Sequence, residues 1–156
     1  MINFQILALP YSQFTPLFNA SNMKLEKFGA IKTIVDKKPG FPCRVSLQDA
    51  EVGEEVILMP YQHHVTNSPY QSAGPIYVRK NITTAILEKN EIPLMLHHRL
   101  LSLRAYNAQG FMLNATVVEG TDLRNALQTI FENDLIAYIH IHNAKPGCFN
   151  CEVQRA

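Results

Sequence analysis

The chain has 156 residues, of which 47% are hydrophobic and 17% charged, with a formal net charge of +1 at pH 7. This length suits one globular domain over residues 1–156 and allows a buried core without disulfides. The dispersed, nearly balanced charge argues against nucleic-acid and membrane-surface partners, which need clustered positive charge. No apolar run approaches the roughly 20 residues of a membrane span, and the N-terminus lacks the pattern of a signal peptide. Three cysteines do not make a disulfide framework, so we expect a cytoplasmic protein with reduced thiols.

The N-terminal part of the sequence predicts a strand, two short helices and a second strand. Apolar and polar residues alternate over residues 2–6, which indicates the first strand. Ser12 and Ser21 are expected N-caps of the two helices, and Gly29 ends the second. Residues 30–35 are rich in β-branched side chains and predict the second strand.

The middle of the sequence has a weaker pattern. Residues 44–47 and 55–59 look extended, and residues 60–75 read as a long polar loop bounded by prolines. A strand is expected over residues 75–79. A short helix follows over residues 92–98, with a proline in its first turn.

The C-terminal third predicts a hairpin, a helix and a closing pair of strands. The hairpin turn is Asn107-Ala108-Gln109-Gly110, and Thr121 is the expected N-cap of a helix with an apolar stripe at helical spacing. The expected strands cover residues 101–106, 111–118, 135–143 and 148–153. Strands joined by short turns predict an α+β fold, mainly an antiparallel or mixed β-sheet with two to four helices packed on it.

The most informative motif is the histidine pair in the strand over residues 135–143. Side chains alternate along a strand, so Tyr138, His140 and His142 share one face. The two imidazoles lie about 7 Å apart along the strand, close enough to contact one ligand. Histidine is a common metal ligand and a natural acid or base, so both are candidate catalytic residues and Tyr138 a candidate ligand-binding residue. The alternative is a half-exposed strand face with ordinary hydrogen bonds.

A thiol in the closing strand is a candidate third metal ligand. Cys148 and Cys151 have Cys-x-x-Cys spacing, but residues three apart on a strand point to opposite faces. A two- or four-residue hairpin loop places Cys151 on the histidine face, and a three-residue loop places Cys148 there. The predicted metal is zinc or another transition metal, held by two histidines and one thiol. A buried, inert cysteine is the alternative for each thiol.

Arginines and a second thiol form the other candidate groups. Arg79 and Arg104 are candidates for holding a carboxylate or phosphate, although ordinary ion pairing also explains each arginine. His63 lies in the expected loop over residues 60–75, where functional residues are frequent, and is a candidate catalytic residue. Cys43 stands beside Arg44, which favours the thiolate, so Cys43 is a candidate nucleophile and Arg44 a candidate ligand-binding residue. The alternative for Cys43 is an unreactive, structural thiol.

The same residues resemble a bacterial family catalogued as a domain of unknown function. The matching stretches are residues 38–47, 68–70, 74–79, 99–106 and 138–149, and the last of them, Tyr-Ile-His-Ile-His-Asn-Ala-Lys-Pro-Gly-Cys-Phe, is specific. The resemblance implies a functional pattern consisting of Cys43, Arg44, His63, Arg79, Arg104, His140, His142 and Cys148. It favours Cys148 over Cys151 as the metal-binding thiol and treats His64 and Cys151 as additions of this chain.

Three functions compete at this stage. The first is a small enzyme or sensor that binds a small anionic molecule through arginine and histidine side chains. The second is a transition-metal-binding domain built on His140, His142 and Cys148. The third is a non-catalytic module that forms a homodimer through a sheet edge left by the C-terminal hairpin.

Overall fold

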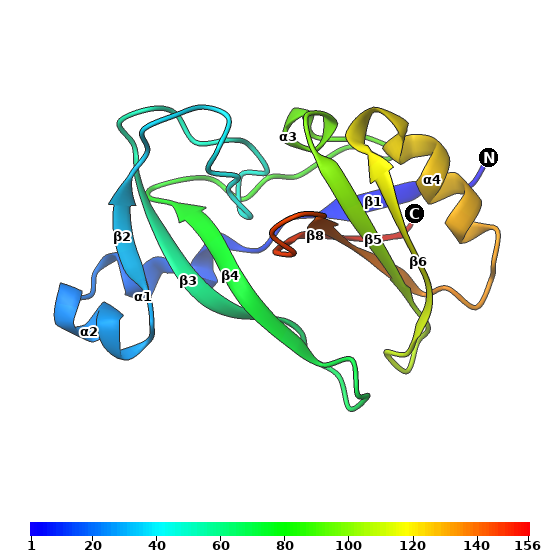
Figure 1. The fold of residues 1–156 in the computed structure, drawn as a ribbon, viewed down its shortest axis with the longest axis horizontal. Coiled ribbons are helices and arrows are strands. Elements are labelled where there is room, and N and C mark those ends of the chain that lie inside the picture. Colours follow the sequence, from blue (N-terminus) through cyan, green and yellow to red (C-terminus); the bar gives the residue numbers. More distant parts are fainter.

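The computed structural model describes residues 1–156 as eight strands and four α-helices, with every strand pairing antiparallel (Figure 1). The predicted α+β fold is confirmed, but the strands divide into two sheets. The five-stranded sheet has the order β1-β8-β7-β5-β6, with β1 Phe4–Leu7, β8 Phe149–Arg155, β7 Tyr138–Asn143, β5 Leu100–Tyr106 and β6 Met112–Glu119. The three-stranded sheet has the order β2-β3-β4, with β2 Ile31–Ile34, β3 Glu55–His64 and β4 Ser72–Arg79.

One face of the five-stranded sheet forms the larger core with α4, Leu123–Phe131. The apolar stripe predicted from the sequence faces this sheet, and its residues Leu123, Leu127, Ile130 and Phe131 are buried. Ile139 and Ile141 of β7 point into the same core. Since side chains alternate along β7, Tyr138, His140 and His142 point to the opposite face, as the sequence predicts.

The three-stranded sheet packs against the short N-terminal helices, which lie beside it in Figure 1. These are the 3-10 helix Tyr11–Gln13, α1 Thr15–Phe18 and α2 Asn22–Lys27. The Oγ atom of Ser21 accepts a hydrogen bond from the backbone N–H of Lys24, so the predicted cap of α2 is confirmed. Gly29 follows α2 with a φ of +71°, a conformation that glycine adopts without strain.

Four local predictions are wrong. Residues 60–75 are not a long loop, because β3 runs through Pro60 to His64 and β4 begins at Ser72. Pro60 pairs with Pro75, and since neither has an N–H, the pair needs no hydrogen bond between them.

The other three errors concern a turn and two helix starts. Ser12 is not the N-cap of a helix, because it lies inside the 3-10 helix Tyr11–Gln13, and α1 begins at Thr15 directly after Phe14. Residues 44–47 form a turn rather than a strand, with Leu47 at a φ of +52°. Thr121 is not the cap of α4, because it lies inside the 3-10 helix Gly120–Asp122 that leads directly into Leu123. The predicted helix over residues 92–98 is the single turn α3, Leu94–His97, preceded by Pro93.

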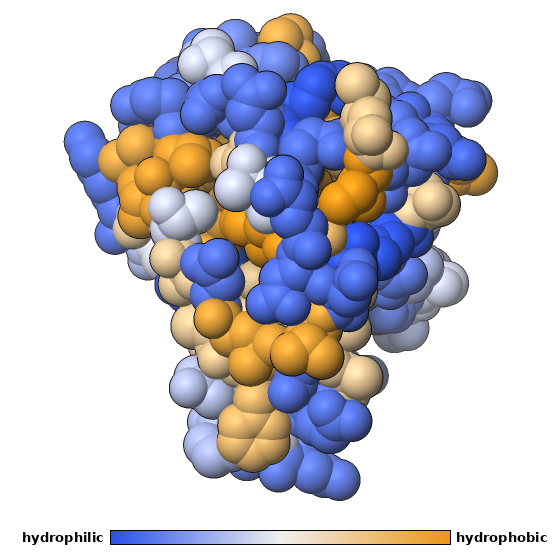
Figure 2. All heavy atoms as spheres, turned by 90° about the vertical axis from the view of Figure 1, so that its right-hand side faces the viewer, coloured by the Kyte–Doolittle hydropathy of each residue, from blue (hydrophilic) through white to orange (hydrophobic).

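The free edges of the five-stranded sheet are β1 and β6, because β1 covers the outer side of β8. The edge expected from the C-terminal hairpin is therefore occupied, and homodimer formation stays a prediction. Figure 2 shows the side of the molecule that carries α4 and β6 as a mosaic of hydrophilic and hydrophobic patches. Leu113 and Val117 of β6 are exposed. None of the helices is both long and apolar enough to cross a membrane.

Candidate metal centre

Three histidines from the two sheets converge on one point. His140 and His142 come from β7 of the five-stranded sheet, and His63 comes from the end of β3 in the other sheet. One ring nitrogen of each lies within 4.8 Å of one ring nitrogen of the other two. The centroid of the His63 ring is 4.9 Å from that of His142 and 6.0 Å from that of His140.

Hydrogen bonds at the far side of two rings fix their tautomers. The Nε2 atom of His140 is 3.1 Å from a carboxylate oxygen of Glu152, and the Nδ1 atom of His142 is 2.9 Å from the carbonyl oxygen of Gly147. Both oxygens are acceptors, so each of these nitrogens carries the proton and donates it. In the neutral imidazole, Nδ1 of His140 and Nε2 of His142 are then left with lone pairs.

The nitrogens that carry these lone pairs are buried and have no hydrogen-bond partner. The same is true of Nδ1 of His63. Buried polar atoms without partners are rare in proteins, and here three of them belong to neighbouring rings. The His63 ring is held in place by stacking on Phe149 of β8, with 5.2 Å between centroids and 7° between planes.

Two of these imidazoles have strongly lowered pKa values. Burial, followed by repulsion from His140, lowers the pKa of His63 from 6.5 to about 4. Burial also lowers the pKa of His142 to about 3, even though the hydrogen bond to Gly147 opposes this shift. Both rings are therefore neutral at pH 7, which is the form that binds metal.

The residues present fit a transition metal. A zinc–nitrogen distance of about 2.0–2.1 Å corresponds to nitrogens about 3.3 Å apart in a tetrahedral site. The three nitrogens, all within 4.8 Å of one another, reach that separation by small side-chain movements. The hydrogen bond from His140 to Glu152 is the carboxylate–histidine arrangement that orients metal ligands and raises their basicity.

The site opens into a cavity of about 520 Å³. His63, His140 and Glu152 line it together with Tyr138, while His142 lies behind them, fully buried. The Tyr138 hydroxyl is 2.6 Å from Nε2 of His64, whose Nδ1 is 2.7 Å from the carbonyl oxygen of Tyr70. Since that carbonyl only accepts, His64 Nδ1 is the donor and Tyr138 donates to Nε2. His64 therefore has no nitrogen free for a metal.

Arg104 adds a positive charge to the site. It lies opposite His140 in the β5–β7 pairing, and its charge contributes to the lowered pKa of His63 and of His142. Its Nε atom donates to the hydroxyl of Ser102 over 3.4 Å, and no carboxylate pairs with it. Arg104 is thus a cation beside the three histidines.

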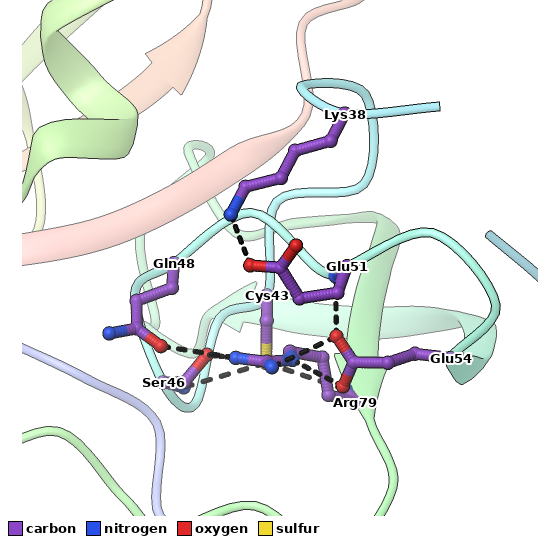
Figure 3. Close-up of polar contacts among 7 residues, drawn as sticks. All are labelled: Lys38, Cys43, Ser46, Gln48, Glu51, Glu54 and Arg79. Carbon is purple, nitrogen blue, oxygen red and sulfur yellow. Dashed lines mark hydrogen bonds and ion pairs between the residues drawn. The ribbon is translucent and has the colours of Figure 1, made fainter. Parts of the chain in front are cut away.

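Arg79 and Cys43 lie in a separate cluster, where every group is satisfied (Figure 3). The Nε and Nη2 atoms of Arg79 each donate to an oxygen of Glu54 over 2.9 Å, and Nη1 donates to Ser46 and Gln48. The Cys43 sulfur accepts the backbone N–H groups of Ser46 and Arg79, 3.4 Å each. The structure brings neither residue to the histidines.

The remaining candidates lie outside the three-histidine cluster. Cys148 accepts a hydrogen bond from Nδ2 of Asn143 over 3.3 Å and is not among the convergent ligands. Cys151 pairs with Ile141 and points into the α4 core, where burial raises its pKa to about 12. The β7–β8 loop has five residues, and the register shifts between Ile141 and His142. None of the predicted loop lengths of two, three or four residues therefore applies.

Glu152 is the functional candidate that the sequence analysis missed. Burial raises its pKa, but hydrogen bonds from His140 and Gln154 outweigh this and hold the pKa below 4.5. The sequence held part of the signal, because a carboxylate in the closing strand of a hairpin has a partner across from it, but the register that decides this partner was left open. Its partner in the pairing is His140.

The fold and the site define an antiparallel α+β protein with a three-histidine cluster between its two sheets. The chain belongs to the family described as "Protein of unknown function (DUF1203)", whose pattern matches residues 40–155. The family resemblance inferred from the sequence is thereby confirmed. The matched range includes all three histidines, Arg104 and Glu152. No curated protein and no solved structure matches the chain.

Proposed function

We propose that this protein binds a transition metal through His63, His140 and His142. Two observations carry the proposal: one ring nitrogen of each histidine lies within 4.8 Å of the other two, and each of the three rings has a buried nitrogen without a hydrogen-bond partner. Hydrogen bonds to Glu152 and to the Gly147 carbonyl fix two of the lone pairs toward the common point. Burying these lone pairs costs free energy, and a metal ion that accepts all three removes this cost.

The donor set indicates the class of metal. Imidazole nitrogens suit zinc, copper, iron and nickel, whereas calcium and magnesium prefer oxygen ligands. Three histidines leave a fourth position, and the cavity lies on the side of His63 and His140. Sites with three protein ligands and an open position are typical of catalytic rather than structural zinc. A bound zinc ion would supply Lewis-acid chemistry and lower the pKa of a bound water to about 7.

The residues around the centre suit a small anionic molecule as the bound partner. Arg104 has no carboxylate of its own, so its guanidinium is available for a carboxylate or phosphate group. Glu152 holds the proton on Nε2 of His140 and thereby keeps Nδ1 free. This combines the first two sequence-based functions, with Arg104 but not Arg79 as the anchor of the anion.

Elemental analysis of tag-free protein tests the proposal. We expect close to one equivalent of metal in the wild-type protein and in His97→Ala, which changes an exposed histidine on α3. We expect loss of the metal in His142→Ala. Because His142 is fully buried, His63→Gln serves as a second, less disruptive variant at a half-buried ligand. Metal-free wild-type protein that also fails to bind added zinc, cobalt or nickel would contradict the proposal.

A further inference from the structure

A second cavity, of about 510 Å³, lies away from the three histidines, and we call it the Arg44 cavity. Its walls come from four places: residues 40–44, Tyr77 of β4, the α3–β5 junction at residues 98–100, and the end of β7 with the following loop at residues 143–148. Four lining residues are basic, namely Arg44, His98, Arg99 and Lys145, and none is acidic. A concave site of this size and charge is suited to a small anionic molecule.

Arg44 is a buried charge without a counter-ion. Its exposed fraction is 1%, and its guanidinium donates from Nε to the Phe149 carbonyl over 2.7 Å and from Nη1 to the Pro42 carbonyl. Both acceptors are neutral. Taking an ion out of water costs several kcal/mol unless an opposite charge accompanies it. The burial lowers the pKa of Arg44 and thus disfavours its charged form.

Two other arginines show what Arg44 lacks. Arg79 is held by both oxygens of Glu54, and Arg99 donates to the two oxygens of Asp49 over 3.0 and 2.5 Å. Arg44 is more buried than either of them, yet no carboxylate pairs with it. Arg44 thus differs from both arginines in having no carboxylate partner.

The Cys148 thiol lies at the wall of the cavity, next to the guanidinium of Arg44. Nδ2 of Asn143 points at its sulfur, and the buried Asn150 fixes that orientation by donating to Oδ1 of Asn143 over 2.8 Å. Two donors, an amide and a guanidinium, thus converge on the same point. Lys145 lies exposed at the rim.

We propose that the Arg44 cavity binds the oxyanion of a small molecule, a carboxylate or a phosphate, with Arg44 as its counter-ion, Lys145 at its entrance and Cys148 in contact with it. The alternative is a purely structural Arg44 that ties residues 42–44 to β8 through two carbonyls. The two accounts differ in what they predict for an anion that reaches Cys148.

Alkylation of Cys148 distinguishes them, because Cys43 and Cys151 are fully buried. Iodoacetate and iodoacetamide react in the same way: the sulfur forms a bond to the CH₂ carbon and iodide leaves. Only iodoacetate carries a carboxylate. We expect the ratio of the iodoacetate rate to the iodoacetamide rate to be roughly tenfold higher in the native protein than in the urea-unfolded chain. Intact mass and peptide mapping verify that Cys148 is the alkylated residue. The variant Cys148→Ser measures the background alkylation at other residues.

Variants and competitors complete the test. Lys145→Gln, an exposed substitution that preserves the fold, should lower the native ratio severalfold, and Arg44→Gln should bring it to the unfolded value. Glu26→Gln, which changes an exposed carboxylate on α2, should leave it unchanged. Protection by phosphate, by acetate or by both, beyond that of chloride at equal ionic strength, identifies the oxyanion. A native ratio no higher than the unfolded one, or protection equal to that of chloride, would overturn the proposal.

Discussion

The molecule holds two clusters of buried polar groups, one around Arg79 and one between the two sheets around His142, and they differ in one respect. In the cluster around Arg79, each of the three donor nitrogens of the guanidinium has an acceptor, and the thiol of Cys43 accepts two N–H groups. In the cluster around His142, three ring nitrogens have no partner. Both clusters combine the residue types that sequence analysis associates with function.

This difference separates stability from binding. A buried polar network whose members satisfy one another stabilises the fold and offers nothing to a ligand. A network with converging lone pairs is stabilised only when something else accepts them. We therefore expect substitutions in the Arg79 cluster to change folding and those in the histidine cluster to change metal binding.

The largest expected effect is on metal affinity in His63→Ala. Removing one of three ligands should weaken zinc binding by at least about a hundredfold, more than the loss of a supporting hydrogen bond. Competition with a chromophoric chelator measures this. The stability of the metal-free variant should stay within about 1 kcal/mol of wild type, since this half-buried ring loses only its stacking on Phe149 and its edge contacts with His140 and His142. An equal loss in the exposed control His97→Ala would contradict the assignment.

The second effect is on stability in Arg79→Ala. Glu54 would lose its bidentate partner in a setting where its side chain is only 27% exposed, and Ser46 and Gln48 would lose a donor. We expect a loss of about 2–3 kcal/mol in urea unfolding, with unchanged metal content. The double variant Arg79→Ala/Glu54→Gln should recover part of this loss because the unpaired charge is gone. A fully folded Arg79→Ala protein that lacks metal would contradict the assignment of the Arg79 cluster to stability alone.

The third effect is the pH dependence of the metal-free protein. His63 and His142 have folded pKa values of about 4 and about 3, below the ordinary 6.5. Between pH 6.5 and 4 the unfolded chain therefore binds more protons, so stability falls as the pH falls. The slope is about 1.4 kcal/mol per pH unit for each fully shifted group. Urea unfolding in EDTA at pH 7, 6 and 5 measures it, and His63→Ala should show a shallower slope. A flat profile would contradict the neutral, buried state of these rings.

Strand β7 shows most clearly which features of the site could be predicted from the sequence. The alternation of Ile139 and Ile141 with the two histidines needs only the period of a strand, and the structure has that arrangement. The position of His63 beside them depends on how the two sheets pack, over a separation of almost eighty residues. No local pattern contains that information. The β3–β4 pairing was likewise not predicted, because Pro60 and Pro75, which pair with each other, are residues typical of loops.

The arginines show the same limit. Arg79 and Arg104 look equivalent in the sequence, as cations in two strands. They differ in their partners. Glu54, directly before β3, pairs with Arg79 at the end of β4, whereas no carboxylate pairs with Arg104. Pairing partners of charged side chains depend on tertiary contacts, which composition and spacing do not determine. The choice between Cys148 and Cys151 likewise depended on a register shift in the β7–β8 hairpin.

The smallest expected effect sharpens the comparison within the histidine cluster itself, through Glu152→Gln. The amide oxygen of glutamine still accepts the Nε2 proton of His140, but without the negative charge that raises the basicity of Nδ1. We expect zinc affinity to fall about tenfold, with the fold intact, because the hydrogen bond to His140 is weakened rather than lost. Chelator competition again provides the measurement, and Glu119→Gln, an exposed carboxylate on β6, is the matched control. If Glu152→Gln and Glu119→Gln bind zinc equally well, the carboxylate does not act through His140. The lone pair of that histidine must then be oriented by the packing of its ring alone.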